Sequence, residues 1–191
     1  MNKATMLFKR NELSAAMLTH FRMTMLTIPE VKNLFEDVIV ADMAPNRHED
    51  YQTEKDFIMN LSNAEDIVSY MRKVRDQANS GLLIERAIGC QDDVMPLIFK
   101  RLSTSGHDVF IENAAILLAN AQEKYTDQLY HIFPQIRNAY ARSELCIVFG
   151  VKQKVEYTDF LLEQSNQLKA ESTDINYEQG PLLALNLIYG E

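Results

Sequence analysis

The sequence predicts an all-α protein, and two observations support that prediction. Apolar residues recur at the three- and four-residue spacing of helices along most of the chain, and no hairpin dipeptide or strand-like alternation interrupts them. From Gly81 onward, apolar segments rich in small residues alternate with longer amphipathic segments at intervals of about thirty residues. A unit of two antiparallel helices cannot bury its apolar face alone, so we expect the helix pairs to stack.

Composition and charge limit the classes of partner. With 191 residues, 47% of them hydrophobic and 24% charged, the chain is long enough to bury its core as one continuous structural domain. It has 19 basic against 27 acidic residues, a net charge of −8. From Asp92 to the end, 8 basic face 14 acidic residues. We therefore expect no nucleic acid and no membrane as partner, and this half should attract a basic protein surface.

The sequence also predicts a cytoplasmic location. The first ten residues lack the apolar core of a secretory signal, and no uncharged run is long enough to cross a bilayer. Cys90 and Cys146 lie far apart in the sequence and outside any CxxC motif, which is typical of reduced thiols.

Residues 1–80 are expected to form a helical segment that packs on the array. Leu13 to Thr24 and Val31 to Ile39 show the periodicity of two amphipathic helices, and a T-x-x-E capping box precedes the second. The polar stretch 44–50 predicts a loop.

A third helix is expected after that loop. The S-x-x-E box that begins at Ser62 predicts its start, and apolar residues continue at helical spacing to Val74. Asn79-Ser80-Gly81 then predicts a helix C-terminus.

Residues 81–191 are expected to hold the stacked pairs. The apolar segments, each expected to be a second helix of a pair, are 81–90, 113–121, 143–151 and 180–189. The amphipathic segments, each beginning with an Asp, are 93–102, 127–136 and 159–168.

Two stretches of this region resemble known repeats. His107 to Leu118 resembles the opening of the second helix of a HEAT-like, armadillo-type repeat, and Gly89 to Ile98 is similar to the start of the first helix. The resemblance covers roughly residues 81–191 and implies a short right-handed α-solenoid with an amino-terminal helical cap. Phe110 departs from the pattern, because that family often has Arg or Lys there to form an ion pair between repeats.

The residues needed for chemistry do not form a recognisable site. No His has a second His or a Glu at metal-ligand spacing, and no nucleophile elbow or phosphate-binding glycine loop occurs, so we expect no metal, no cofactor and no catalysis. Cys146 is expected to be buried. Arg72, Lys73 and Arg75 form the densest basic cluster, which we interpret as the solvated face of a helix.

The leading functional hypothesis is a non-catalytic protein-binding or scaffold module whose concave face meets a partner. The polar residues expected there are Glu112, Asn113, Asn120, Tyr140, Arg142, Glu144 and Glu178. The last helix is apolar on nearly every side, so we expect a homodimer or partner interface that includes Leu182, Leu185, Ile188 and Tyr189.

Two alternatives remain open. The acidity is also what an immunity or antitoxin-like neutralising protein would use against a basic target. A helical-repeat enzyme would have to draw its acid and base groups from one repeat junction, where Asp92, Asp93, His107 and Asp108 lie.

Overall fold

The computed structural model describes residues 45–74, 77–171 and 175–190. Within these ranges every regular element is a helix, which confirms the all-α prediction. The expected helices over 13–24 and 31–39 lie outside the described residues. The elements are α3 (Pro45–Met59), α4 (Ala64–Tyr70), α5 (Gln77–Gly89), α6 (Gln91–Leu102), α7 (Asp108–Asn120), α8 (Glu123–Ile132), η3 (Phe133–Gln135), α9 (Ala139–Val151), η4 (Val155–Tyr157), α10 (Thr158–Glu171) and α11 (Gln179–Tyr189).

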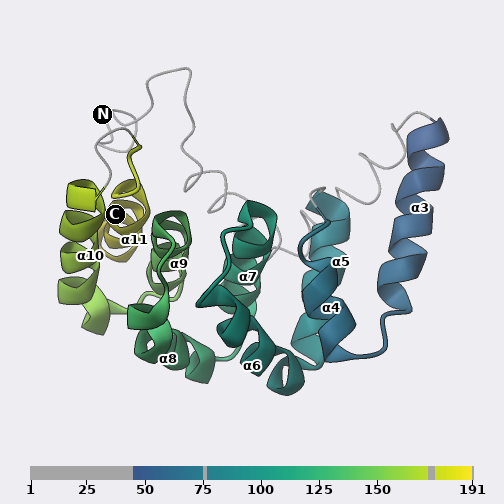
Figure 1. Ribbon diagram of the computed structural model, residues 1–191, viewed down its shortest axis with the longest axis horizontal. Coiled ribbons are helices and arrows are strands. Elements are labelled where there is room, and N and C mark those ends of the chain that lie inside the picture. The colour runs from purple at the N-terminus through teal and green to yellow at the C-terminus, as the bar shows by residue number, and fades with distance from the viewer. Residues whose placement is uncertain (1–44, 75–76, 172–174, 191) are drawn as a thin grey trace.

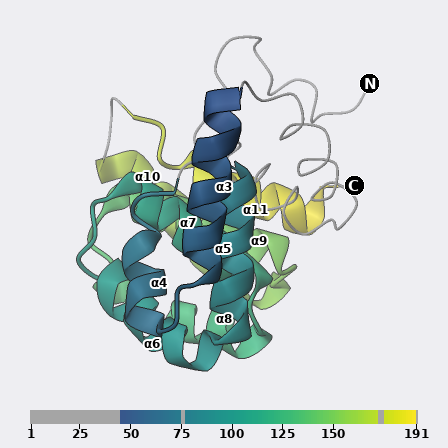
Figure 2. The same cartoon turned by 90° about the vertical axis from the view of Figure 1, so that its right-hand side faces the viewer.

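The helices pack in two rows (Figure 1). In one row α3, α5, α7, α9 and α11 each pack against the next, and in the other α4 packs on α6 and α6 on α8. Helix α10 packs against both α9 and α11. Figure 2 looks along the rows from the α3 end, with α4 and α6 on one side of α3 and α11 on the other. Helices α5, α7 and α9 begin 31 residues apart (77 to 108 to 139), so one spacing in the sequence becomes one step along the row.

One continuous core runs from Ile58 in α3 to Ala184 in α11. Helices α7 and α9 lie in its centre and are buried on almost every side, as expected of helices that are apolar nearly all round. Met71, Cys146 and Phe149 are completely buried, and for Cys146 this confirms the prediction.

Helices α9 and α11 approach each other closely through small residues. A Cβ atom added at Gly150 would lie 2.5 Å from the Cα of Ala184, and one added at Gly180 would overlap the backbone of Ser143. Only a residue without a side chain fits at these two points, so this pair of glycines sets the spacing of the last two helices in the row.

The polar stretch 44–50, predicted to be a loop, is instead the start of helix α3 from Pro45 onward. Proline is well placed at a first helical position, where its missing N–H has no partner to lose. Among the described side chains of α3 only Tyr51 and Ile58 are buried, so the helix has no amphipathic stripe to reveal it. Packing on α5 stabilises it as a helix.

The predicted stop at Asn79-Ser80-Gly81 is also wrong, because these residues lie inside α5. Asn79 and Ser80 are buried, and Asn79 Nδ2 donates to Glu54 Oε2 of α3 at 2.8 Å. The same residue types that favour a helix end in isolation here join two helices of one row.

The start of α4 is displaced by one residue from its prediction. Asn63, rather than Ser62, is the N-cap, and its side chain accepts a hydrogen bond from the backbone N–H of Asp66 at 2.9 Å. The Asn63 amide also donates to the Asp66 carboxylate at 2.6 Å, and this side-chain pair holds the cap in place.

The C-terminal end of helix α4 is capped by a side chain that is remote in the sequence. The Asn113 amide, in the middle of α7, donates to the carbonyls of Met71 and Val74, each at 2.9 Å. These carbonyls belong to the segment that leaves α4, where backbone acceptors lack partners within the helix. A buried side chain of α7 therefore caps the end of α4.

The helix predicted over 127–136 begins at Glu123 and ends at Ile132. It ends early because Pro134 cannot donate to the helical ladder, and η3 takes over. Five aromatic rings then pack between α8, α9 and α10, with Tyr130 stacked on Tyr157 at 4.5 Å and Phe133 edge-on to Phe160 at 4.9 Å.

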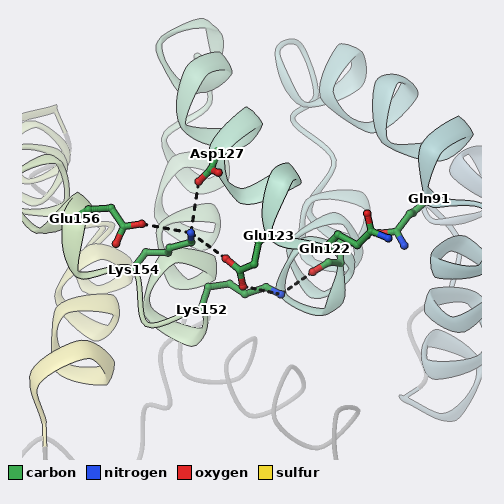
Figure 3. Close-up of polar contacts among 8 residues, drawn as sticks. Gln91, Gln122, Glu123, Asp127, Lys152, Lys154 and Glu156 are labelled. Carbon is green, nitrogen blue, oxygen red and sulfur yellow. Dashed lines mark hydrogen bonds and ion pairs between the residues drawn. The ribbon is translucent and has the colours of Figure 1, made fainter.

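Polar contacts join the segment that follows α9 to α8 and to the end of α7 (Figure 3). Lys154 reaches three carboxylates, those of Glu123 at 2.9 Å, Glu156 at 3.3 Å and Asp127 at 3.5 Å. Lys152 donates to the carbonyl of Ala121 at 2.6 Å. Three carboxylates of the second half are thus paired within the chain.

Candidate functional site

Three of the residues expected on an exposed concave face are buried. Asn113 is 0% exposed, Glu144 1% and Arg142 9%. Asn113 closes α4, and both guanidinium arms of Arg142 donate to the Glu171 carboxylate on α10. Helices α7 and α9 are packed on nearly every side. The polarity of a residue in either helix therefore does not place it on the surface. The expectation that Asn113, Arg142 and Glu144 are exposed is wrong.

The other four residues of that set are half-buried. The Tyr140 hydroxyl donates to Glu112 Oε1 at 2.9 Å. Burial raises the pKa of Tyr140 well above its ordinary value, and the carboxylates of Glu144 and Glu112 raise this pKa further. Asn120 donates to a carbonyl of its own helix, and Glu178 is the N-cap residue of α11. Glu112, Tyr140 and Glu144 therefore meet, but in an internal polar contact.

The last helix is covered largely within the chain. Helix α11 packs on α9 and α10, and Leu185 and Ile188 are partly buried against the core. Leu182 and Tyr189 remain 48% and 58% exposed, and the Tyr189 hydroxyl is 2.7 Å from that of Thr158. The neighbouring helices thus cover α11 only in part, and an interface that includes Leu182 and Tyr189 stays a prediction.

The four residues of the enzyme alternative do not converge. Asp92 and Asp93 lie in the first turn of α6, whereas His107 lies beyond the last turn of that helix, beside Arg101. At a rise of about 1.5 Å per residue, this helix separates the two ends by roughly 15 Å. Asp92 instead accepts hydrogen bonds from Lys124, at 2.6 Å, and from the Tyr125 hydroxyl.

This contact predicts a pH dependence of stability. Hydrogen bonds from Lys124 and then Tyr125 lower the pKa of Asp92 below its ordinary value. A carboxyl whose pKa is lower in the folded state stabilises that state above its ordinary pKa, and the contribution is lost as the pH falls through the lowered value. Asp92→Asn should therefore reduce the melting temperature at neutral pH, and the difference from the parent should shrink in strong acid. An equal difference at every pH, measured by circular dichroism, would contradict this assignment.

Two negative observations apply to the described part of the chain. There, no group of three or more His, Cys, Asp and Glu side chains is placed to hold a metal ion. None of the helices described is long and apolar enough to cross a membrane.

The strongest candidate site is a cavity of about 940 Å³ between α4, α6 and the start of α7, which we call the cation cleft. Three separate stretches of the chain line it. They are the end of α4 with the residues that follow it, the end of α6 with the α6–α7 loop, and the first turn of α7. The lining residues are Ser69, Arg72, Lys73, Arg101, Thr104, Ser105, Gly106, His107 and Phe110.

The local fold explains why cations gather there. Asn113 caps the end of α4, so Arg72 and Lys73 lie just beyond the helix. Both are exposed and line the opening of the cleft. Arg101 lies in the last turn of α6, where a cation is favoured by the helix dipole, and its Nη2 donates to Ser69 Oγ at 3.0 Å. The cleft therefore lies where two helices end.

The charges of the cleft lack carboxylate partners among the residues that the structure describes. Among the described residues, none of Arg72, Lys73 and Arg101 forms an ion pair, and no Asp or Glu lines the cavity. Elsewhere in the array Lys124 and Lys154, among other cations, lie against carboxylates. An unpaired cationic cavity in a protein of net charge −8 is a local exception to the overall field.

Two further cavities continue the cleft on either side. One, of about 370 Å³, shares Ser69 and Lys73 with it and is lined also by Phe57, Leu61 and Tyr70. The other, of about 770 Å³, shares the loop 104–106 and adds Arg137. Because they share lining residues, the three cavities form one groove. It runs from the end of α3 past the α6–α7 loop to the start of α9.

Only part of this site could be predicted from the sequence. Arg72 and Lys73 were noticed but interpreted as a solvated helix face, and Arg75 lies outside the described residues. Arg101 was overlooked because it is far from them in the sequence and ends a different helix. The regular spacing of the helices, which places the end of α4 beside the end of α6, is the signal that could have linked Arg101 to Arg72 and Lys73.

Comparisons with known protein families, with characterised proteins and with solved structures found no match for this chain.

Proposed function

We propose that this protein is a non-catalytic binding module, a short right-handed α-solenoid of HEAT-like helix pairs, whose groove holds an acidic segment of a partner protein. The two rows of helices and the 31-residue step support the solenoid. The observation that carries the function is the set of three cations, Arg72, Lys73 and Arg101, that line one cavity without an ion pair in the described part of the chain.

The local charge favours an acidic partner over the basic one that net charge predicted. Cations that lack carboxylate partners need not break an ion pair when an anionic segment binds, and charge complementarity fixes its register. The carboxylates that would attract a basic partner are in part already bound, since Lys154 holds Glu123, Asp127 and Glu156. For the same reason the neutralising-protein alternative loses part of its support.

A direct test compares two labelled peptides of equal length, oligoglutamate and oligolysine, by fluorescence anisotropy with the full chain. We expect oligoglutamate to bind and its affinity to fall with added salt. Arg72→Glu, at an exposed position, should weaken this binding by about tenfold or more, the equivalent of 1.4 kcal/mol.

Lys169→Glu is the matched control. It makes the same change of charge on an exposed residue of α10, away from the groove, and should leave affinity nearly unchanged. Binding of oligolysine but not oligoglutamate, or equal losses in both variants, would overturn the proposal. Thermal melts establish that both variants are folded.

A further inference from the structure

The cation cleft and the smaller cavity beside it differ in chemistry although they share two residues. Ser69 and Lys73 line both. On one side of them lie guanidinium and hydroxyl groups, and on the other lie the rings of Phe57 and Tyr70 with the side chain of Leu61. The lining of this smaller cavity is completed by the polar residues Asn60, Ser62 and Asp66. A ligand that fills both cavities must be anionic at one point and apolar close by.

The donors of the cation cleft suit a phosphoryl group better than a single carboxylate. Two arginines and a lysine supply positive charge, and Ser69, Thr104 and Ser105 add hydroxyl groups. A phosphate monoester carries nearly two negative charges and three acceptor oxygens, so it can use several such donors at once. The first turn of α7 borders the cavity, and its N-cap residue His107 makes no capping hydrogen bond through its side chain.

The smaller cavity has an exposed aromatic wall. Phe57 packs against Tyr70 with ring centroids 4.8 Å apart, yet remains 51% exposed. An aromatic side chain that is half-open to solvent beside a cavity of about 370 Å³ gives an apolar side chain a place to be buried.

We propose that the groove recognises a phosphorylated segment of a partner protein, with the phosphoryl group in the cation cleft and a neighbouring apolar side chain against Phe57 and Tyr70. A nucleic acid strand fits these observations less well, because the surrounding protein is acidic and the apolar cavity adjoins the cationic one at a single end. This inference rests on the proposed function and specifies the ligand of the same groove.

The test uses the full chain and a set of short labelled peptides that carry one phosphoserine. A leucine is placed in turn at each neighbouring position on either side, and matched peptides have serine for phosphoserine or alanine for leucine. We expect phosphorylation to raise affinity about tenfold or more, and leucine to add to it at one preferred position.

Two variants of α3 separate the apolar contact from general effects. Phe57→Ala should remove the advantage of leucine over alanine while the advantage of phosphoserine persists. Met59→Ala, at a residue of the same helix that is 50% exposed and does not line the cavity, should change neither. Arg72→Glu should remove the advantage of phosphoserine.

The outcomes distinguish this inference from the function on which it rests. If oligoglutamate binds and is lost in Arg72→Glu, but phosphorylation leaves peptide affinity unchanged, the inference is overturned and the proposed function stands. If short phosphorylated nucleic acid strands bind more tightly than every phosphopeptide, the assigned ligand class is wrong. If neither oligoglutamate nor any phosphopeptide binds, both proposals fail.

Discussion

Gly180→Ala is expected to lower the free energy of unfolding by about 3 kcal/mol, at the upper end of what overpacking a core costs. A methyl group there would overlap the backbone carbonyl of Ser143 and lie 2.5 Å from its hydroxyl oxygen. The hydroxyl can rotate but the backbone carbonyl cannot, so α11 must move away from α9. For a chain of this length the melting temperature should fall by roughly 6–12 °C.

Gly89→Ala is the matched control for this substitution. Gly89 ends α5, and a Cβ atom added there meets nothing within 4 Å. Alanine at an unstrained helical position removes freedom from the unfolded chain, so this variant should be unchanged or more stable by about 0.4–1 kcal/mol. If thermal melts of the two variants coincide, the close approach of α9 and α11 is not as described.

Asn113→Ala should destabilise the protein by about 2–4 kcal/mol, because the amide is fully buried and closes two hydrogen bonds to backbone carbonyls. The carbonyls of Met71 and Val74 would lose this donor at the end of α4. The loss should be visible in chemical denaturation as a lower midpoint with an unchanged slope.

Asn120→Ala provides the comparison within the same helix. Asn120 is half-buried and its amide donates only to the carbonyl of Ile116, four residues earlier. Its removal should cost well under half as much. Equal losses for the two variants would mean that the contact between α7 and the end of α4 contributes no additional stability.

Helices that bury a full apolar face were the most predictable. The segments expected over 93–102, 143–151 and 159–168 all lie within helices, because a stripe of apolar residues is both the pattern in the sequence and the surface that is buried. Helix α3 was missed for the complementary reason, since only two of its described side chains are buried.

Local signals failed where a distant residue acts. Asn79 and Ser80 look like a helix end, but Glu54 holds Asn79 inside α5. The end of α4 depends on Asn113, which lies about forty residues further along and gives no sign of this role in its own neighbourhood.

The net charge of the whole chain does not reveal the candidate site. A net charge of −8 predicts attraction to basic partners, but the cations of the cleft come from two helix ends that only the packing of α4 on α6 brings together. Residues expected to face a partner were chosen for polarity within α7 and α9, the two most deeply buried helices.

Hydrogen exchange of the full chain, with and without oligoglutamate, tests most directly the central claim that a partner binds along the groove. Bound peptide should slow amide exchange in segments that cover residues 69–73 and 101–107, and should leave 179–189 unchanged. Slowed exchange confined to 179–189, with none at the cation cleft, would contradict the account and return the interaction to the last helix.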